Sequence, residues 1–228
     1  MPGNKIKRST AGECLVFFVY RCEYDQRVRN AIIRFSGRIK SYGGEKLGIA
    51  TDVMVLCAPD DSPWKNRNDW CVALLGFPNQ KSARLWFISE PEIKQHDFPP
   101  PSDGFLIFSV RIRYPPVTGR LTFCWTELSS IRSKGELQRD YVDPMATLMD
   151  RHNIDHGLVF INDKDCDQLD RLRDCWLPYH AYYRLDVYDS EDEICRFYQS
   201  DDAKNLVQVR NNLCATTQVA FTIDPKIC

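Results

Sequence analysis

One sixteen-residue pattern occurs twice in this chain and constrains the fold more than any other feature of the sequence. The copies cover residues 77–92 and 188–203, at a constant offset of 111 residues. In each copy an apolar stretch ends on an aromatic residue, a polar turn follows, and an aromatic pair then precedes a Ser and an acid. The aligned positions are Ala83 with Ile194, Trp86-Phe87 with Phe197-Tyr198, and Ser89 with Ser200. Short-repeat solenoids recur every ~20–50 residues, so this offset predicts a duplicated domain.

The length agrees with two domains, because 228 residues can form two units of roughly 100 residues, each with its own core. A turn-rich connector, Tyr114-Pro115-Pro116-Val117-Thr118-Gly119, lies between the copies. We therefore expect a first repeat over residues 13–114 and a second over residues 120–224.

The charge balance is nearly even, with 30 Lys and Arg against 31 Asp and Glu. A net charge of -1 provides no overall attraction to nucleic acid or to an anionic membrane. The chain has no run of 18 apolar residues, and its polar, basic start lacks the apolar core of a signal peptide. We expect a cytoplasmic or nuclear protein that does not enter a membrane.

Hydrophobic periodicity predicts the same order of elements in both repeats. In the first, strands are expected at 14–20, 52–57, 70–77 and 105–110, with helices at 25–42 and after residue 79. In the second, strands are expected at 121–126, 158–161, 179–188 and 216–223, with helices starting at Asp143-Pro144 and at about Ser190, the latter interrupted near Asp201. This βαββαβ order is typical of the ferredoxin-like α+β unit, an antiparallel sheet with two helices on one face.

The faces of the predicted strands indicate how the two sheets pack. Strands of the first repeat are apolar on both sides, although its helices cover only one side. Strands of the second repeat have one apolar and one mixed side. We expect the sheets to face one another as a partly closed barrel that encloses the mixed side, forming an intrachain pseudo-dimer. The residues alone leave pairing between two chains open.

These features resemble a known family. The element order, the helix that ends in Tyr42-Gly43-Gly44 and the Ala-x-x-aromatic-aromatic-x-Ser-acid motif are similar to the dimeric alpha-beta barrel superfamily, especially its small members of unknown function. The resemblance covers residues 14–113 well and 120–224 more loosely, with Asn153-Ile154 in place of the two glycines. It implies a fold shared with muconolactone isomerases, haem-degrading monooxygenases and stress-responsive barrel proteins, whose chemistries differ.

Four residues that alternate along one strand are the candidate catalytic groups: His180, Tyr182, Arg184 and Asp186. In a barrel with its site between the sheets, His180 would move protons and Arg184 would hold a carboxylate. A solvated sheet face has the same alternation, and Arg184 then pairs with Asp186. Both interpretations remain open at this point.

No cofactor and no metal site is predicted. The ten cysteines form no C-x-x-C pair and mostly lie in apolar runs, which indicates buried free thiols. A haem-degrading barrel needs a histidine on a helix, and the first repeat has none there. His152 ends a helix of the second repeat and His96 lies in a predicted loop.

The main functional expectation is a non-catalytic protein-interaction or adaptor module with a protein partner. Its candidate contact residues are the loop aromatics Trp64 and Trp176 and the helix cations Arg34 and Arg38. One alternative is a small-molecule-binding or enzymatic barrel, isomerase-like or monooxygenase-like, with its site between the sheets. A further alternative is RNA binding through an open sheet face, with stacking aromatic residues on the strand at 179–188.

Overall fold

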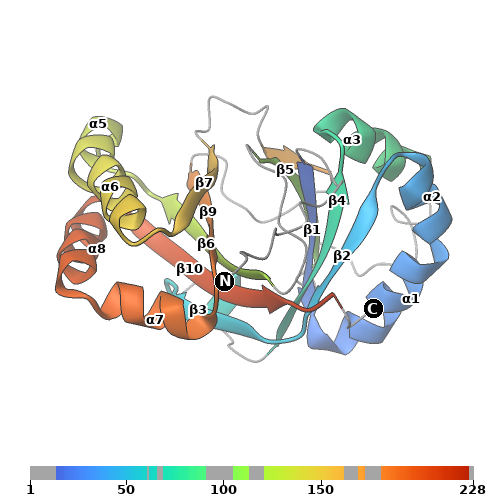
Figure 1. The fold of residues 1–228 in the computed structure, drawn as a ribbon, viewed down its shortest axis with the longest axis horizontal. Coiled ribbons are helices and arrows are strands. Elements are labelled where there is room, and N and C mark those ends of the chain that lie inside the picture. The colour runs from blue at the N-terminus through green and yellow to red at the C-terminus, as the bar shows by residue number, and fades with distance from the viewer. Residues whose placement is uncertain are drawn as a thin grey trace, which may run out of the picture.

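Two five-stranded antiparallel sheets form the centre of the fold (Figure 1). The computed structural model describes residues 14–60, 62–65, 69–90, 105–112, 121–161, 169–172 and 181–225, with only the backbone at 155–161 and 169–171. The first sheet has the spatial order β2 (Glu45–Ala50), β4 (Trp70–Phe77), β1 (Cys14–Arg21), β5 (Leu106–Arg111) and β8 (Leu169–Arg171). The second has the order β3 (Val53–Cys57), β10 (Ala215–Ile223), β6 (Leu121–Ser129), β9 (Tyr182–Tyr188) and β7 (Asp155–Ile161).

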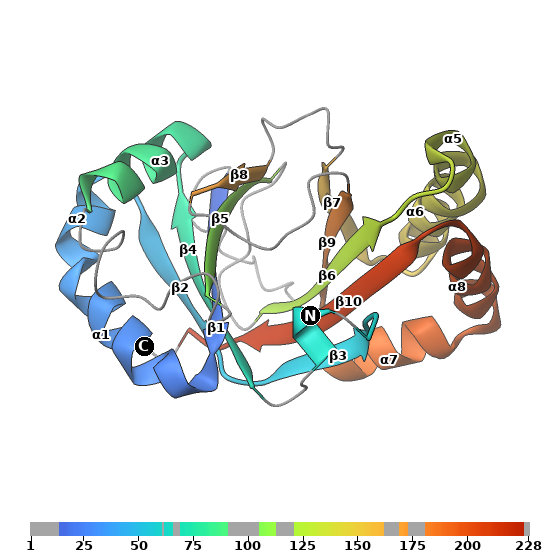
Figure 2. The same cartoon turned by 180° about the vertical axis from the view of Figure 1, so that it is seen from behind.

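Helices cover the outer side of each sheet (Figures 1 and 2). The first sheet carries α1 (Asp25–Arg34), α2 (Ser36–Ser41) and α3 (Gln80–Ser89). The second carries α5 (Lys134–Leu137), a π-helical turn (Gln138–Val142), α6 (Asp143–Arg151), α7 (Glu191–Gln199) and α8 (Asp201–Leu213). Among the described residues of the first half, the 3₁₀ turns η1 (Cys22–Tyr24) and η2 (Pro63–Lys65) lie in the connections between elements.

The strand orders confirm the α+β class and the ferredoxin-like arrangement. In chain order, the four strands that each half contributes to its own sheet lie in space as fourth, first, third and second. The fifth strand of each sheet comes from the other half of the chain. Strand β3 pairs with β10, and β8 pairs with β5, so each half extends the other's sheet.

One predicted strand is therefore assigned to the wrong sheet. Residues 52–57 were expected to pair within the first sheet, but β3 pairs with β10 of the second. Its expected place beside β4 is taken by Glu45–Ala50, which has a bulge between Lys46 and Gly48. The charged residues and the glycine of this strand interrupt the alternation of apolar and polar side chains, so hydrophobic periodicity did not predict the strand.

The inner faces of the two sheets pack on one another. Leu15, Phe17 and Val19 of β1 lie in the same buried cluster as Phe123 of β6 and Phe221 of β10. The ring of Phe17 lies 6.3 Å from that of Phe221, edge to face, across the two sheets. The intervening β1 residues Val16, Phe18 and Tyr20 instead pack under the helices of the first half. Both sides of β1 are buried for this reason.

The two halves also share local geometry at equivalent positions. Gly43 and Asn153 both adopt positive φ after a helix, at 74° and 54°. The following N–H groups, of Gly44 and Ile154, bond to the Ile39 and Met149 carbonyls, which ends both helices in the same way. Asn tolerates the left-handed conformation better than other non-glycine residues, so this replacement conserves the turn.

The repeated motif begins and ends its two helices alike. Asn79 and Ser190 cap α3 and α7 by accepting hydrogen bonds from the N–H groups of Ser82 and Glu193. At the other end the Ser89 hydroxyl donates to the Trp86 carbonyl at 2.7 Å, and Ser200 donates to Phe197 at the same distance. Ser200 also caps α8, which confirms the predicted interruption near Asp201.

The first helical segment of the second half starts earlier than predicted. We expected a start at Asp143-Pro144, but the chain is already helical from Lys134, capped by Ser133. The π-helical turn before α6 joins the segments, and Pro144 lies in the first turn of α6. A wide π turn accommodates the proline, so the signal interpreted as a helix start lies within a longer helical segment.

Among the helices that the structure describes, none is long and apolar enough to cross a membrane. The expected cytoplasmic or nuclear location stays a prediction.

Candidate functional site

The mixed face of β9 does not point between the sheets, which corrects the expected site. Tyr182 and Tyr188 pack in the cluster under α6, α7 and α8. The intervening residues Tyr183 and Leu185 occupy the core between the sheets. The apolar side of β9 faces the apolar inner side of the other sheet and therefore joins the inter-sheet core. The mixed side of β9 meets polar groups from the helices.

Arg184 and Asp186 form a buried ion pair on this helix-facing side. Arg184 Nε lies 2.8 Å from Asp186 Oδ2, and Arg184 Nη2 donates to the Tyr198 hydroxyl at 3.1 Å. Burial by itself lowers the pKa of Arg184, but the charge of Asp186 outweighs it and the pKa lies well above the ordinary value. The guanidinium is thus engaged inside the protein, and this geometry is that of a structural ion pair. Of the four predicted catalytic residues, His180 lies outside the described residues.

Of the four predicted partner-binding residues, Trp64 is buried, whereas Arg34 and Arg38 lie on the surface. Trp64 is 3% exposed and its ring lies 5.2 Å from that of Trp70 in the inter-sheet core. Arg38 pairs with the buried Glu90 at 3.4 Å, and the Arg34 guanidinium lies 4.9 Å from the centre of the Phe35 ring. The other predicted anchor, Trp176, lies outside the described residues.

A different residue, Glu127 on β6, carries an ionisable group on the inner face. Phe123 and Trp125 of the same strand lie in the inter-sheet core, so residue 127 continues that face at the two-residue spacing of a strand. Its neighbours across the sheet are Thr217 on β10 and Tyr183 on β9. Glu127 is 5% exposed.

Burial raises the pKa of the Glu127 carboxyl from its ordinary value of 4.5 to about 7. Removal from water is the cause, because a carboxylate loses hydration when it is surrounded by protein. Within the described part of the chain, no hydrogen bond or ion pair involves this carboxyl. Near neutral pH the group is therefore present in both its protonated and its ionised form.

Polar groups and aromatic rings surround this position. The Trp125 indole N–H is buried and finds no acceptor among the described residues, and its ring lies 5.2 Å from that of Tyr183. The Thr217 hydroxyl lies 3.5 Å from that of Ser62, in the segment that carries Trp64. A carboxyl, an indole donor and a hydroxyl pair thus occur beside aromatic side chains at one end of the inter-sheet core.

The sequence does contain a signal for this residue. Leu121, Phe123 and Trp125 define the apolar side of the strand, and Glu127 is the next position on that side. The strand was predicted to end at Thr126, so the acid was not recognised as an inward-facing group. The observed strand continues to Ser129.

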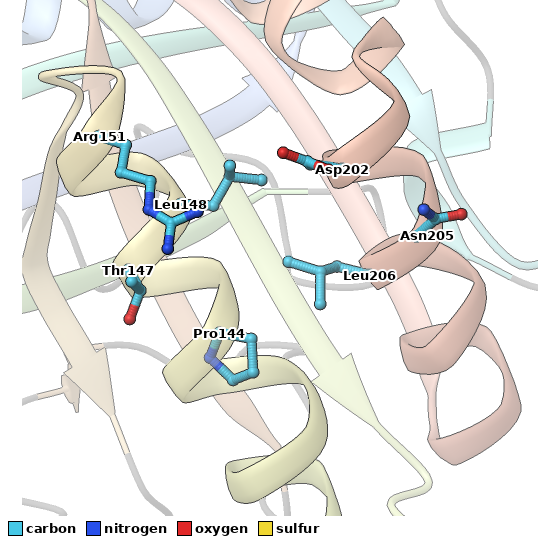
Figure 3. A pocket seen from close by; sticks show the side chains of 7 residues that line it. All are labelled: Pro144, Thr147, Leu148, Arg151, Asp202, Asn205 and Leu206. Atoms are coloured by element: carbon cyan, nitrogen blue, oxygen red, sulfur yellow. The ribbon is translucent and has the colours of Figure 1, made fainter.

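A surface groove of about 380 Å³ lies between α6 and α8 (Figure 3). Its apolar lining comes from Pro144, Leu148 and Leu206. Arg151 on α6 and Asp202 on α8 add one charged group from each helix. These two charged groups are not an ion pair among the described residues, and no buried ionisable group faces the groove. We place no reaction there.

The described residues also contain no group of three or more His, Cys, Asp or Glu side chains placed to hold a metal ion. The open sheet face required by the RNA-binding alternative is not present among them either. The inner faces pack together and the outer faces carry helices.

Comparison with protein-family models gives no match, and comparison with curated proteins gives none either. Several solved structures share the general outline of the chain. A dye-decolorizing peroxidase from Bacteroides thetaiotaomicron VPI-5482 has a TM-score of 0.49 and 8% identity, over 98% of this chain and 97% of that one. An anthrone oxidase-like protein has a TM-score of 0.46 and 9% identity, over 95% and 93%. A mutant chlorite dismutase from Candidatus Nitrospira defluvii has a TM-score of 0.45 and 7% identity, over 98% of each chain.

The expectation of a non-catalytic adaptor is wrong. Two of the solved structures reported above carry the names of a peroxidase and an anthrone oxidase-like protein, and in this chain the proposed anchor Trp64 is buried. At these identities and TM-scores the likeness transfers no activity and no cofactor to this chain. Any function has to be argued from the chain's own residues.

Proposed function

We propose that this protein is a small-molecule-binding enzymatic barrel with its site between the sheets, at the end of the core that holds Glu127. In this proposal residues 13–114 and 120–224 are two repeats of the dimeric alpha-beta barrel type, joined as an intrachain pseudo-dimer. The observation that carries the proposal is a buried carboxyl that has no hydrogen bond or ion pair to the described residues and whose pKa is raised to about 7.

Glu127 is the proposed general base and acid. A carboxyl with a pKa near the working pH accepts a proton readily and returns it readily, which is the requirement for both steps of a proton transfer. An isomerase-like reaction that moves a proton from one substrate atom to another needs such a group. A monooxygenase-like reaction needs it when the first step removes a proton from the substrate.

The neighbouring side chains support an aromatic substrate with a weakly acidic proton. The rings of Trp125 and Tyr183 provide flat apolar surfaces, and the Trp125 N–H provides a donor for a substrate oxygen. An oxyanion that forms as Glu127 removes the proton would accept this hydrogen bond.

The test uses the intact chain and 2-naphthol, a fluorescent aromatic alcohol, titrated from pH 5.5 to 8.5. We expect saturable binding whose pH dependence has a midpoint near 7, and a loss of this midpoint in Glu127→Gln. Trp125→Phe keeps an aromatic ring but removes the donor, and it should weaken binding several-fold at every pH. Native mass spectrometry of the protein purified from cells looks for a retained small molecule.

The matched control is Glu136→Gln, an exposed acid before the π turn that should leave the titration unchanged. Saturable binding that is identical in the wild type, Glu127→Gln and Trp125→Phe would overturn the site. Absence of any binding together with absence of a retained molecule would overturn the function.

A further inference from the structure

Cys22 and Cys71 bring two thiols into contact at the junction of β1 and β4. Cys22 opens the turn η1 directly after β1, and its N–H donates to the Asp69 carbonyl at 3.0 Å. Cys71 is the second residue of β4 and pairs with Tyr20 in the strand register. The two sulfur atoms lie 3.1 Å apart, and neither cysteine is part of a disulfide in this structure.

This distance is within reach of a covalent bond. A disulfide has a sulfur–sulfur length of about 2.05 Å, so the two atoms have to approach by roughly 1 Å. The Cys22 end of the pair lies in a short turn, where a small backbone adjustment is less costly than inside a strand. Arg21 and Asp69 form an ion pair at 2.6 Å at the same junction, which keeps the two chain segments together.

The two thiols differ in access. Cys22 is partly exposed, whereas Cys71 is 1% exposed. Burial, together with the contact to Cys22, raises the pKa of the Cys71 thiol. Cys22 is accordingly the thiol that a molecule from solution can reach, and Cys71 is a buried thiol in contact with the Cys22 sulfur.

We propose that Cys22 and Cys71 are an oxidisable dithiol, a modification site that a low-molecular-weight disulfide converts to an intramolecular disulfide. The Cys22 thiolate attacks one sulfur of the small disulfide, forming a mixed disulfide and releasing one small thiol. The Cys71 thiolate then attacks the Cys22 sulfur, which forms the Cys22–Cys71 bond and releases the second small thiol. The small disulfide is reduced, the protein dithiol is oxidised, and the two protein protons end on the released thiols.

The Cys22–Cys71 disulfide would link the turn η1, which precedes α1, to β4. Cys22 and Cys71 are 49 positions apart, so closing this loop restricts the unfolded chain and is expected to raise the Tm. Cys71 follows Trp70, whose indole N–H donates to the Pro63 carbonyl at 3.1 Å. The disulfide would therefore form next to Trp70, the residue whose hydrogen bond holds the segment that carries Ser62 and Trp64. The proposal stands without the proposed function, and its test does not use activity.

The experiment equilibrates the folded full chain with glutathione disulfide and maps the products by non-reducing digestion and mass spectrometry. We expect a linked peptide pair containing residues 22 and 71, a higher Tm than that of the reduced protein, and reversal of both by dithiothreitol. In Cys71→Ser the first step still occurs, so Cys22 should accumulate as the glutathione mixed disulfide. In Cys22→Ser, Cys71 should stay a free thiol.

Cys195→Ser is the matched control, because Cys195 is also partly exposed and lies on α7 of the other half. It should leave the linked pair unchanged. If Cys71→Ser does not fold, Cys71→Ala replaces it, and the Tm under reducing conditions identifies a variant that folds. The proposal is overturned if wild-type Cys22 ends as a stable glutathione adduct, stays reduced, or links to a cysteine other than Cys71.

Discussion

Two buried ionisable side chains on neighbouring strands differ in whether an opposite charge compensates their own. Arg184 keeps its charge because Asp186 neutralises it at 2.8 Å. Glu127 has no such partner among the described residues, so removal from water shifts it toward its protonated form. A residue whose burial is compensated is structural, whereas one that is poised between two protonation states is available for proton transfer.

The raised pKa of Glu127 predicts a specific pH dependence of stability. The folded state holds this proton up to about pH 7, whereas the unfolded chain releases it near pH 4.5. Between these values the folded state binds more protons, so stability falls as pH rises, by about 3 kcal/mol in total. Glu127→Gln cannot ionise, so its stability relative to the wild type should rise from pH 5 to pH 8.

Urea denaturation at pH 5 and pH 8 measures this difference, with Glu136→Gln as the exposed control. Equal changes of the unfolding free energy in wild type and Glu127→Gln between the two pH values would show that the carboxyl is not desolvated in the folded protein.

At the scale of elements, one close approach joins the two sheets at a corner. Ile49 on β2 and Asp224 after β10 exchange backbone hydrogen bonds of 3.4 and 3.3 Å. Gly48 lies beside this bridge with φ of +148°, and a Cβ atom there would lie 2.6 Å from the Asp224 carbonyl oxygen. Only glycine fits both the conformation and the space.

Gly48→Ala is therefore expected to destabilise the protein by on the order of 2–3 kcal/mol, because it adds both backbone strain and a clash with main-chain atoms. Gly37→Ala is the matched control. Gly37 is an exposed helical glycine, and no atom lies within 4 Å of the place that an added Cβ would take, so this change should stabilise by about 0.5–1 kcal/mol. Thermal and urea unfolding of both variants measure the contrast. A Gly48→Ala protein as stable as the wild type would contradict the close approach.

At the scale of the whole molecule, the two halves are not independent units. They share one inter-sheet core, and each contributes an edge strand to the other's sheet. Separating them would expose the inner faces of both sheets and the edges of β5 and β10. The expectation that each repeat buries a core of its own therefore holds only for the layer between sheet and helices.

This sharing predicts the behaviour of the separated halves. Fragments cut within the connector, 1–116 and 117–228, should each lack a cooperative unfolding transition when expressed alone. Coexpressed, they should copurify as a one-to-one complex with a cooperative transition, because association restores the shared core. Circular dichroism and size-exclusion chromatography measure both properties. A fragment that unfolds cooperatively as a monomer would contradict the shared-core arrangement.

The sequence by itself determined the repeated motif, the α+β class and the burial of both sides of β1. It did so because hydrophobic alternation, helix caps and the repeated motif are local signals: Asn79 and Ser190 cap the helices wherever those helices pack. Only the tertiary structure decided which sheet β3 joins and which face of β9 turns inward. Both outcomes depend on strands that are distant in sequence. β3 pairs with β10, and β9 pairs with β6, and the local sequences of β3 and β9 do not specify these partners. Glu127 became a candidate for the same reason, because its pKa is set by the protein packed around it and not by its neighbours along the chain.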